Sequence, residues 1–540
     1  MSDFPDEAGV DAGATAWVLT SSALVLLMSL PGLALFYGGF VRAKNVLSVI
    51  AACFAITALT TVLWVIIGYS ITFTDGGPVN PFIGGVSRVF MAGVNKDTEL
   101  GRPGAHAPVP LAADAVYQGS YAFLGPALIV GSVVERMKTK AVIMFAGWFL
   151  LLVYCPVAHM LWAPGGWMNS WGVLDWAGGL VVGTTAGIAG LVAAVMVGPR
   201  RGYPDTVFRP HNMTLVVLGT GMLWTGWIGF EGGTGLKADG VASMAVFTTH
   251  VAGAFGALGW TGIEWLLHHG RPSILGFCAG AVAGLAGVTP AAGYVGVAGS
   301  AVIGVVSAFV CYVMAVFVKE RAGWDESLDA FGVHATGGMV GTILVAILGS
   351  PTLGGAPNDN YDIGIQLGKQ LAGVAFVVAY SVIISFLLLK AIGFCTGGLR
   401  VSAEAEAKGL DIAELDDGAY LFGRQVWEQH GFVADAATTA ARLVDRVTAR
   451  ELRGSWGHDG MRERSGRGIL GQSLLPSASE DGLGSPGLSG AIEGHEPVSP
   501  LPGHVGTLNG AQSPAGAGAT AGASREAHGT SPPTAAAADP

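Results

Sequence analysis

The sequence predicts an all-α fold, a polytopic membrane bundle of eleven transmembrane helices. Of the 540 residues, 51% are hydrophobic and only 12% are charged, whereas a soluble globular protein carries roughly a quarter charged residues. Glycine occurs 84 times, inside apolar runs, where small residues let helices pack closely in a bilayer. The apolar runs are about 20 residues or longer, enough to cross roughly 30 Å of hydrocarbon.

Eleven such runs follow one another along the chain. They are residues 16–39, 46–73, 114–135, 141–163, 178–198, 213–233, 242–267, 273–289, 296–319, 333–349 and 370–394. The residues before the first run are acidic and include no Lys or Arg, unlike the positive start of a cleavable signal peptide. We therefore expect the first run to remain as a helix.

Basic residues predict the orientation of the bundle, because Lys and Arg are retained in cytoplasmic loops. They gather in alternate connections, namely at Arg42, Lys44, Arg136, Lys138, Lys140, Arg200, Arg201, Arg209, Arg271, Lys319 and Arg321. The N-terminus is therefore expected outside the cell and the C-terminus inside.

Composition divides the chain into four segments. Residues 1–15 are expected to be extracellular, 16–394 to form the transmembrane domain, and 395–464 to form a cytoplasmic region with an amphipathic helix around 436–452. Residues 465–540 are rich in Gly, Pro, Ala and Ser, which cannot bury enough apolar surface to offset ordering. We expect this tail to be disordered.

A weak internal repeat lies within the transmembrane domain. LDWAGG at 174–179 and LDAFGV at 328–333 each open a glycine-rich span, and five spans separate the two. Copies so placed face opposite ways across the membrane, as in an inverted five-helix repeat with the substrate path at the repeat interface.

Three histidines lie in apolar surroundings. His334, in GVHATGGMVG, is the most informative, because an ionisable group at bilayer depth is costly and marks a pathway. The alternative is a neutral histidine bonded to a helix carbonyl. His159 and His250 are similarly placed, and their neighbours do not decide between the two interpretations.

Aromatic and polar side chains share one face of a later span. Trp227, Phe230, Glu231 and Thr234 follow the i, i+3, i+4, i+7 spacing of a helix face,. If this face lines a cavity, its rings can hold a cation by about 0.5 to 2 kcal/mol each. The bland alternative is an interfacial aromatic belt with a snorkelling acid. The same belt would by default account for a second aromatic patch, formed by Tyr117, Tyr121 and Trp162.

With these residues in place, the sequence resembles the ammonium transporter family (Amt/Mep/Rh), most closely in its Amt/Mep branch. The resemblance covers about 400 residues, in conserved order, through FYGGFVRAKNVLS, YQGSYAF, LIVGSVVER, AHMLW, DWAGGLVVGTTAGIAG, RPHN, GWIGF, GVTPAAGYVG, FGVHATGG and GLRV. It implies eleven helices with the N-terminus outside, a homotrimer, and one narrow hydrophobic pore per subunit in the cell membrane.

The resemblance also implies roles for single residues. Tyr121, Trp162 and Thr234 match the outer ammonium-binding site, although the family usually has Phe at the first position and Ser at the last. The remaining matches are Tyr121 and Phe230 as a stacked gate with Tyr117 beside it, Trp227 and His334 as pore residues, and Asp175 as a structural support of the outer site.

One departure from the family concerns the pore. The family usually has a first pore histidine at the position that Gly183 occupies here, so His334 lacks its partner. A hydrogen-bonded histidine pair supplies one donor and one acceptor for a proton relay, whereas His334 alone needs water. Gly183 also opens volume, so we expect weaker discrimination against K⁺. Glu231, if it faces the vestibule, would raise the local cation concentration.

The leading hypothesis is uptake of ammonium, as ammonia with separate proton transfer or by direct ion permeation. The alternatives are an ammonium sensor with little transport and a less selective K⁺/NH₄⁺ channel. An intramembrane enzyme is disfavoured because no HExxH or GxSxG constellation lies in the spans.

Five scattered cysteines without CxxC spacing indicate neither a metal nor a disulfide framework. Cofactors and nucleic acid are not expected. Membrane lipid is an expected partner. The resemblance also implies a PII-type regulator, but Leu415, Asp416 and Asp417 depart from the family pattern, so the sequence leaves PII binding open.

Overall fold

The computed structural model describes residues 10–100, 109–355 and 361–420. All of them lie in the first of two compact units of the chain, Met1–Val444. The predicted amphipathic helix at 436–452 and the predicted disordered tail lie outside the described residues, as does most of the N-terminal segment. Within the described ranges the fold is all-helical, and its only β-pairing consists of two isolated bridges.

The α-helices alternate with short π-helical and 3₁₀ turns. The α-helices are α1 (Ala12–Leu27), α2 (Leu33–Phe40), α3 (Val46–Leu63), α4 (Tyr69–Phe73), α5 (Leu111–Leu128), α6 (Val130–Val133), α7 (Thr139–Phe149), α8 (Cys155–Trp162), α9 (Trp167–Trp171), α10 (Thr185–Val197), α11 (Met213–Gly232), α12 (Gly240–Leu267), α13 (Ile274–Val288), α14 (Val297–Tyr312), α15 (Lys319–Ala322), α16 (Thr336–Leu348), α17 (Ile363–Thr396), α18 (Ala403–Lys408) and α19 (Leu410–Leu415). The π-helical turns are η1 (Met28–Gly32), η3 (Trp64–Gly68), η6 (Leu150–Tyr154), η7 (Gly179–Thr184), η8 (Val313–Val318) and η9 (Ala330–Ala335). The 3₁₀ turns are η2 (Ala43–Asn45), η4 (Gly77–Val79), η5 (Val89–Met91) and η10 (Pro351–Leu353).

Side-chain caps begin several of the long helices where the sequence changes from polar to apolar. Asp11 accepts from the Ala14 N–H at 2.7 Å, Asn212 from Leu215 at 3.1 Å, and Asp362 from Ile365 at 2.8 Å. Each cap satisfies a backbone donor that has no partner inside the helix. These polar caps fix where the apolar runs begin.

Within the described residues, nine helical stretches are long and apolar enough to cross a membrane. They correspond to nine of the predicted spans. The other two predicted spans coincide with α5 plus α6 and with α13. Helix α13 is apolar but only 15 residues long. The structure therefore supports a multi-pass bundle, while the number eleven and the orientation stay predictions.

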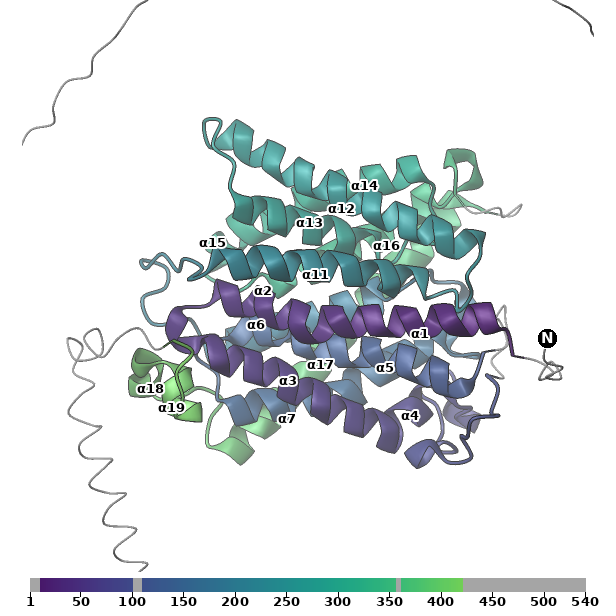
Figure 1. Cartoon of the computed structure of the whole chain (residues 1–540), viewed down its shortest axis with the longest axis horizontal. Coiled ribbons are helices and arrows are strands. Elements are labelled where there is room, and N and C mark those ends of the chain that lie inside the picture. Colours follow the sequence, from purple (N-terminus) through teal and green to yellow (C-terminus); the bar gives the residue numbers. More distant parts are fainter. Residues whose placement is uncertain (1–9, 101–108, 356–360, 421–540) are drawn as a thin grey trace, which may run out of the picture. The chain divides into compact units, whose positions relative to one another are not determined.

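The long helices run side by side, and α11 packs against α1, α2 and α12 (Figure 1). Glycine lets these backbones meet. A Cβ on Gly341 of α16 would lie 1.8 Å from the carbonyl oxygen of Gly287 on α13, and one on Gly219 of α11 would lie 2.4 Å from the Phe36 nitrogen on α2. The predicted use of glycine for close helix contact is present at these crossings.

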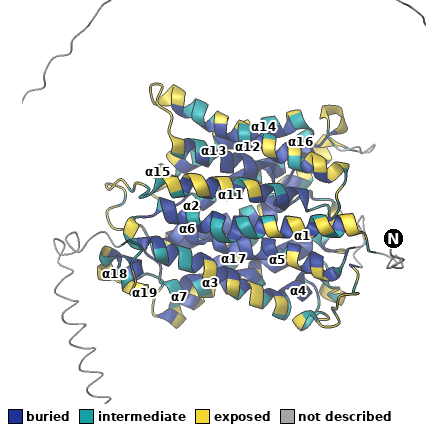
Figure 2. Cartoon of the chain, viewed as in Figure 1, coloured by how far each residue is buried: buried dark blue, intermediate teal, exposed yellow. Residues whose placement is uncertain are grey.

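The outward faces of the bundle are apolar. Figure 2 shows exposed residues along the outer sides of α12 and α14 and buried ones in the interior. Among the exposed side chains, Phe247 is 53% exposed, Leu258 65% and Phe309 56%. Large exposed apolar faces are unusual for a soluble monomer and suit contact with lipid.

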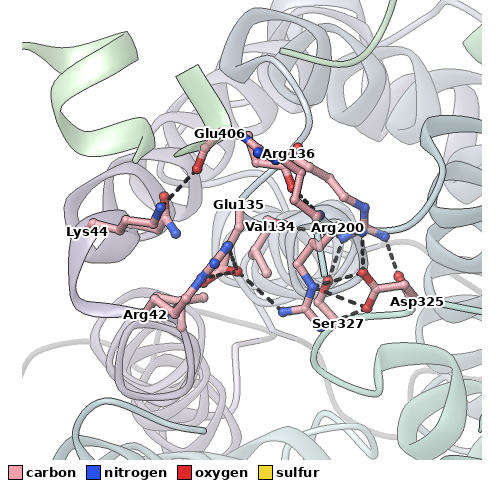
Figure 3. Close-up of polar contacts among 12 residues, drawn as sticks. Arg42, Lys44, Val134, Glu135, Arg136, Arg200, Asp325, Ser327 and Glu406 are labelled. Carbon is pink, nitrogen blue, oxygen red and sulfur yellow. Dashed lines mark hydrogen bonds and ion pairs between the residues drawn. The ribbon is translucent and has the colours of Figure 1, made fainter. Parts of the chain in front are cut away.

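The end of the bundle that carries α18 and α19 lies opposite the start of α1 (Figure 1). There, Arg200 pairs with Asp325 at 2.7 Å, and Arg42 pairs with Glu135 at 2.7 Å (Figure 3). The arginines hold the pKa values of both carboxyls below their usual range, against the opposing effect of burial. Arg200 also lies 3.4 Å from Glu135, so four of the loops predicted to be cytoplasmic, all but the one that carries Arg271, meet in one ion-pair network.

The segment after α17 is anchored to this network. Glu406 pairs with Arg400 at 2.7 Å and accepts from the Arg201 N–H at 2.7 Å. Lys44 donates to the Glu406 carbonyl at 3.0 Å (Figure 3). Asp411 accepts from the backbone N–H groups that open α3, Leu47 at 3.0 Å and Ser48 at 2.7 Å. The chain that leaves the last long helix is therefore held against the start of α3.

Candidate functional site

Aromatic rings from three segments meet at one place. Tyr117 and Tyr121 project from α5, Phe230 from the last turn of α11, and Trp162 ends α8. The Tyr121 and Phe230 rings stack with centroids 4.0 Å apart and planes 19° apart, while Trp162 meets Tyr121 edge-on at 5.9 Å. With Thr234 these four residues form what we call the aromatic cluster.

Hydroxyl groups lock the aromatic cluster around one carbonyl. The Phe230 carbonyl accepts from the Tyr117 hydroxyl at 2.6 Å, from Thr234 at 3.0 Å, and also from Tyr121. The Tyr121 and Thr234 hydroxyls are 2.9 Å apart. Each hydroxyl oxygen has two lone pairs, so these groups retain the capacity to accept from an N–H donor. The predicted trio of Tyr121, Trp162 and Thr234 is thus brought together.

Asp175 supports the cluster from behind. It is 5% exposed, and its carboxylate accepts from the backbone N–H groups of Gly178 at 3.2 Å, Leu180 at 2.9 Å and Val181 at 3.1 Å. Its carbonyl accepts from the Trp162 indole at 2.9 Å. Burial raises the pKa of Asp175 to about 6, although these N–H donors act against the rise. Its contacts fit the structural role that the resemblance implied.

A small apolar cavity adjoins the Tyr121–Phe230 stack. The volume open to the centre of a water molecule is ≈ 20 Å³, enough for about one water. Its wall consists of Met28, Leu124, Leu128, Gly178, Gly179, Val182, Gly183, Leu223, Trp227, Phe230, Ala286, Thr289 and His334. Phe230 therefore belongs to both the aromatic cluster and the cavity.

His334 is the ionisable residue in the cavity wall. It is 5% exposed, and its ring lies parallel to that of Trp227 at 6.2 Å. Among the described residues its imidazole has no hydrogen bond to a carbonyl, so the alternative of a carbonyl-bonded core histidine does not hold. It projects from η9, and π-helical turns of this kind recur at functional sites.

Gly183 faces the backbone of His334. It lies in η7 and in the cavity wall, and a Cβ on it would stand 2.9 Å from the His334 carbonyl oxygen. The absence of a side chain at Gly183 therefore lets the His334 backbone approach closely, while the expected extra volume for water stays a prediction. The same distance means that any side chain at position 183 requires the two π-helical turns to move apart.

Glu231 does not face a vestibule. Its side chain is fully buried, and neither carboxylate oxygen has a hydrogen-bond partner among the described residues. The expectation that it gathers cations from solvent is wrong, because packing encloses the turn of α11 that carries it. The helical spacing placed it on the face of Trp227 and Phe230, yet only those two line the cavity.

The other singled-out histidines lie away from the cavity. His159 is buried, with its ring nitrogens 2.8 Å from the Thr72 carbonyl and 2.5 Å from that of Asn80. His250 is exposed on α12 beside Trp224. Neither histidine lines the cavity.

Thr289 is a cavity residue that the sequence analysis did not predict. Thr289 lines the cavity and accepts from the Trp227 indole at 2.9 Å. Its signal was its place in GVTPAAGYVG, where a hydroxyl follows an apolar span. The adjoining backbone also pairs with the segment just before η7, since the backbone N–H of Trp176 donates to the Pro290 carbonyl and that of Ala177 to the Thr289 carbonyl.

An apolar helical bundle with a small internal cavity beside an aromatic cluster is typical of a multi-pass membrane transport protein. The comparison with known families identifies it further. The chain belongs to the Ammonium Transporter Family, whose model matches residues 16–420. It is accordingly a protein of the cell membrane.

Individual relatives agree with this assignment. An ammonium transporter of Aquifex aeolicus (strain VF5) is 42% identical over 427 residues, 77% of this chain and 95% of the relative. Among solved structures, Saccharomyces cerevisiae Mep2 is similar with a TM-score of 0.66 and 33% identity, covering 74% of this chain and 89% of that one. A protein titled "Sensor Amt Protein" is similar with a TM-score of 0.68 and 25% identity, covering 74% of this chain and 98% of its own.

Proposed function

We propose that the chain takes up ammonium through the pore marked by the aromatic cluster, the apolar cavity and His334. Membership of the Ammonium Transporter Family supports ammonium as the substrate. The observation that supports the mechanism is the double role of Phe230, which stacks on Tyr121 in the aromatic cluster and also lines a cavity that is almost wholly apolar.

Recognition of the ion takes place at the aromatic cluster. Ring faces attract a desolvating cation by about 0.5 to 2 kcal/mol each. The Thr234 and Tyr121 hydroxyl oxygens accept hydrogen bonds from ammonium, which K⁺ does not donate. Aromatic and hydroxyl contacts together therefore favour NH₄⁺ over a bare ion of similar size.

Passage through the cavity favours the neutral molecule. A charge in an apolar enclosure without partners is strongly disfavoured, whereas ammonia carries none. The ion therefore gives up its proton at the aromatic cluster, ammonia passes His334, and the proton follows separately. Direct permeation of the ion is the alternative within the same function, and it would need several waters in the cavity.

An ammonium sensor with little transport is the second candidate. The similarity to the protein titled "Sensor Amt Protein" and the absence of a first pore histidine at Gly183 favour it. Expression in cells that lack other ammonium carriers separates the two. Growth on low ammonium excludes a pure sensor, and a correctly inserted protein that restores no growth excludes a transporter.

The assembly and topology are part of the proposal. We infer a homotrimer in lipid, which membership of the family supports. We also infer that the N-terminus is outside and the C-terminus inside, which the clustering of Arg42, Arg136 and Arg200 at one end supports. Native mass spectrometry and labelling of introduced single cysteines test these points. A PII-type regulator would meet this end, and a binding assay with such a protein decides whether it does.

Electrophysiology on a solid-supported membrane tests the function itself. Purified full-length protein in vesicles is expected to give a saturable current on addition of ammonium and a much smaller one on addition of K⁺. Equal currents would support the less selective K⁺/NH₄⁺ channel. Folded protein that moves neither ion, and takes up no methylammonium, contradicts the proposal.

A further inference from the structure

Glu231 is a buried carboxyl group without a hydrogen-bond partner among the described residues. The side chain is fully buried, and both oxygens lack a donor. Burying an unpaired carboxylate carries a large free-energy penalty. The surroundings therefore suit a protonated carboxyl and oppose a permanent negative charge.

The nearest polar groups explain why the carboxylate has no donor. The Trp227 indole and the Thr289 hydroxyl adjoin the Glu231 carboxyl, but their hydrogens are engaged elsewhere. Trp227 donates to Thr289 at 2.9 Å, and Thr289 donates to the Leu285 carbonyl at 2.8 Å. The Thr289 oxygen retains one lone pair, which a protonated Glu231 can reach as a donor.

Glu231 directly follows Phe230 on α11, and Phe230 belongs to both the aromatic cluster and the cavity wall. The carbonyl of the preceding residue, Phe230, holds the hydroxyls of the aromatic cluster. One turn earlier on α11, Trp227 stands in the cavity wall beside His334, and Thr289 also lines that cavity. The Glu231 carboxyl thus lies one residue along α11 from the carbonyl that holds the aromatic cluster, and Trp227 and Thr289 connect it to the cavity.

The other titratable groups near Glu231 are Asp175, Tyr117 and Tyr121. Asp175 has its carboxylate occupied by three backbone N–H donors. The tyrosine hydroxyls are bonded to the Phe230 carbonyl. Of these groups only Glu231 has a carboxyl free to exchange a proton without breaking an existing hydrogen bond.

We propose that Glu231 is the proton-relay residue of the pore and performs the task for which His334 lacks a partner. Its O–H bond breaks as the proton passes to the Thr289 hydroxyl, whose own hydrogen turns away from the Leu285 carbonyl. That hydrogen passes through one cavity water to the His334 imidazole, which becomes an imidazolium beside the Trp227 ring. An N–H bond of ammonium then breaks, its proton restores the Glu231 carboxyl, and ammonia enters the cavity. The sum is NH₄⁺ and neutral His334 giving NH₃ and protonated His334.

This inference rests on the proposed function, and Glu231→Gln tests it. Glutamine keeps the shape but cannot exchange a proton. Ammonium-evoked currents are recorded from full-length protein in vesicles between pH 5 and 8, in H₂O and in D₂O. The variant is expected to lose at least about tenfold in current, together with the pH dependence and the solvent isotope effect of the wild type.

Two further variants separate a relay from a structural role. Glu264→Gln alters another buried carboxyl, which Ser273 holds on α12 and α13, and it is expected to keep wild-type pH dependence and isotope effect. Thr289→Val removes the relay hydroxyl and is expected to repeat the loss, whereas Thr289→Ser restores the current.

Thermal unfolding in detergent shows whether the variants fold. Glu231→Gln is expected to melt no lower than wild type, because it removes an unpaired buried acid. A folded Glu231→Gln protein with wild-type current, pH profile and isotope effect overturns the inference, and so does an equal loss in Glu264→Gln. If the wild type itself gives no current and no uptake, the proposed function fails instead.

Discussion

The rings of Trp227 and His334 lie parallel, 6.2 Å apart between centroids and 3° apart between planes. The indole N–H of Trp227 points away from this pair, to Thr289. Trp227 therefore presents a ring face toward His334 and no donor. A molecule beside the imidazole meets one apolar wall and one ionisable one, which suits a small neutral base.

Removing Trp162 is expected to weaken ammonium binding. Loss of one cation–π contact of about 0.5 to 2 kcal/mol corresponds to a roughly 2- to 30-fold rise in apparent KM. Concentration dependence of the current in Trp162→Ala measures it. Trp171→Ala, an exposed ring on α9, is the matched control, and an equal rise in both variants contradicts a binding role for Trp162.

Filling position 183 is expected to sharpen selectivity. Gly183→His adds an imidazole beside His334, reduces the space for water, and should lower the K⁺ current relative to methylammonium. Because a Cβ there stands 2.9 Å from the His334 carbonyl oxygen, the variant needs a check of its melting temperature. An unchanged current ratio in a folded variant would show that Gly183 does not set selectivity.

Glu326 predicts a pH dependence of stability. Burial, followed by the nearby charge of Asp329, raises the pKa of Glu326 to about 7 from its ordinary 4.5. A raised pKa means that its contribution is fully present below about pH 4.5 and is lost as the pH rises through about 7. Glu326→Gln should flatten the melting temperature over this window. The loss of stability at acidic pH should remain in this variant, because it comes from Glu135 and Asp325, whose lowered pKa values make them titrate at lower pH.

Melting curves in detergent between pH 4.5 and 8 give the comparison. Glu320→Gln, on the surface of α15, should keep the wild-type profile. A Glu326→Gln profile as steep as the wild type would assign the dependence to another group.

Asp411 is expected to hold the segment after α17 in place. It caps α3 from outside that helix, and loss of a capping side chain costs about 0.5 to 2 kcal/mol. In Asp411→Ala, amide hydrogen exchange should accelerate across α19 and the first turn of α3. Asp417 is exposed two residues beyond α19, and Asp417→Ala should leave this exchange rate unchanged. If the amides stay protected in both variants, the segment is held elsewhere, at Glu406.

Local sequence was sufficient for much of the fold. Nine of the predicted spans contain long apolar helices, because hydrophobic length is a property of consecutive residues,. Glycine inside these runs predicted close crossings, and Gly341 and Gly219 show them. The spacing of Trp227 and Phe230 correctly placed both on one face, since helix periodicity fixes that relation.

The resemblance predicted which distant residues meet, and the geometry agrees for Tyr121, Trp162 and Thr234. No rule of spacing along the chain brings α5, α8 and α11 together. Their functional roles stay predictions.

The sequence by itself determined an all-helical membrane bundle, the positions of its apolar helices and the presence of an ionisable residue, His334, within one of them. Only the tertiary structure decided that Glu231 is enclosed without a partner, that Thr289 joins the cavity wall, and that Asp411 caps α3. The physical reason is that hydrophobic length and periodicity are written in neighbouring residues, whereas burial and hydrogen-bond pairing depend on segments that are distant along the chain.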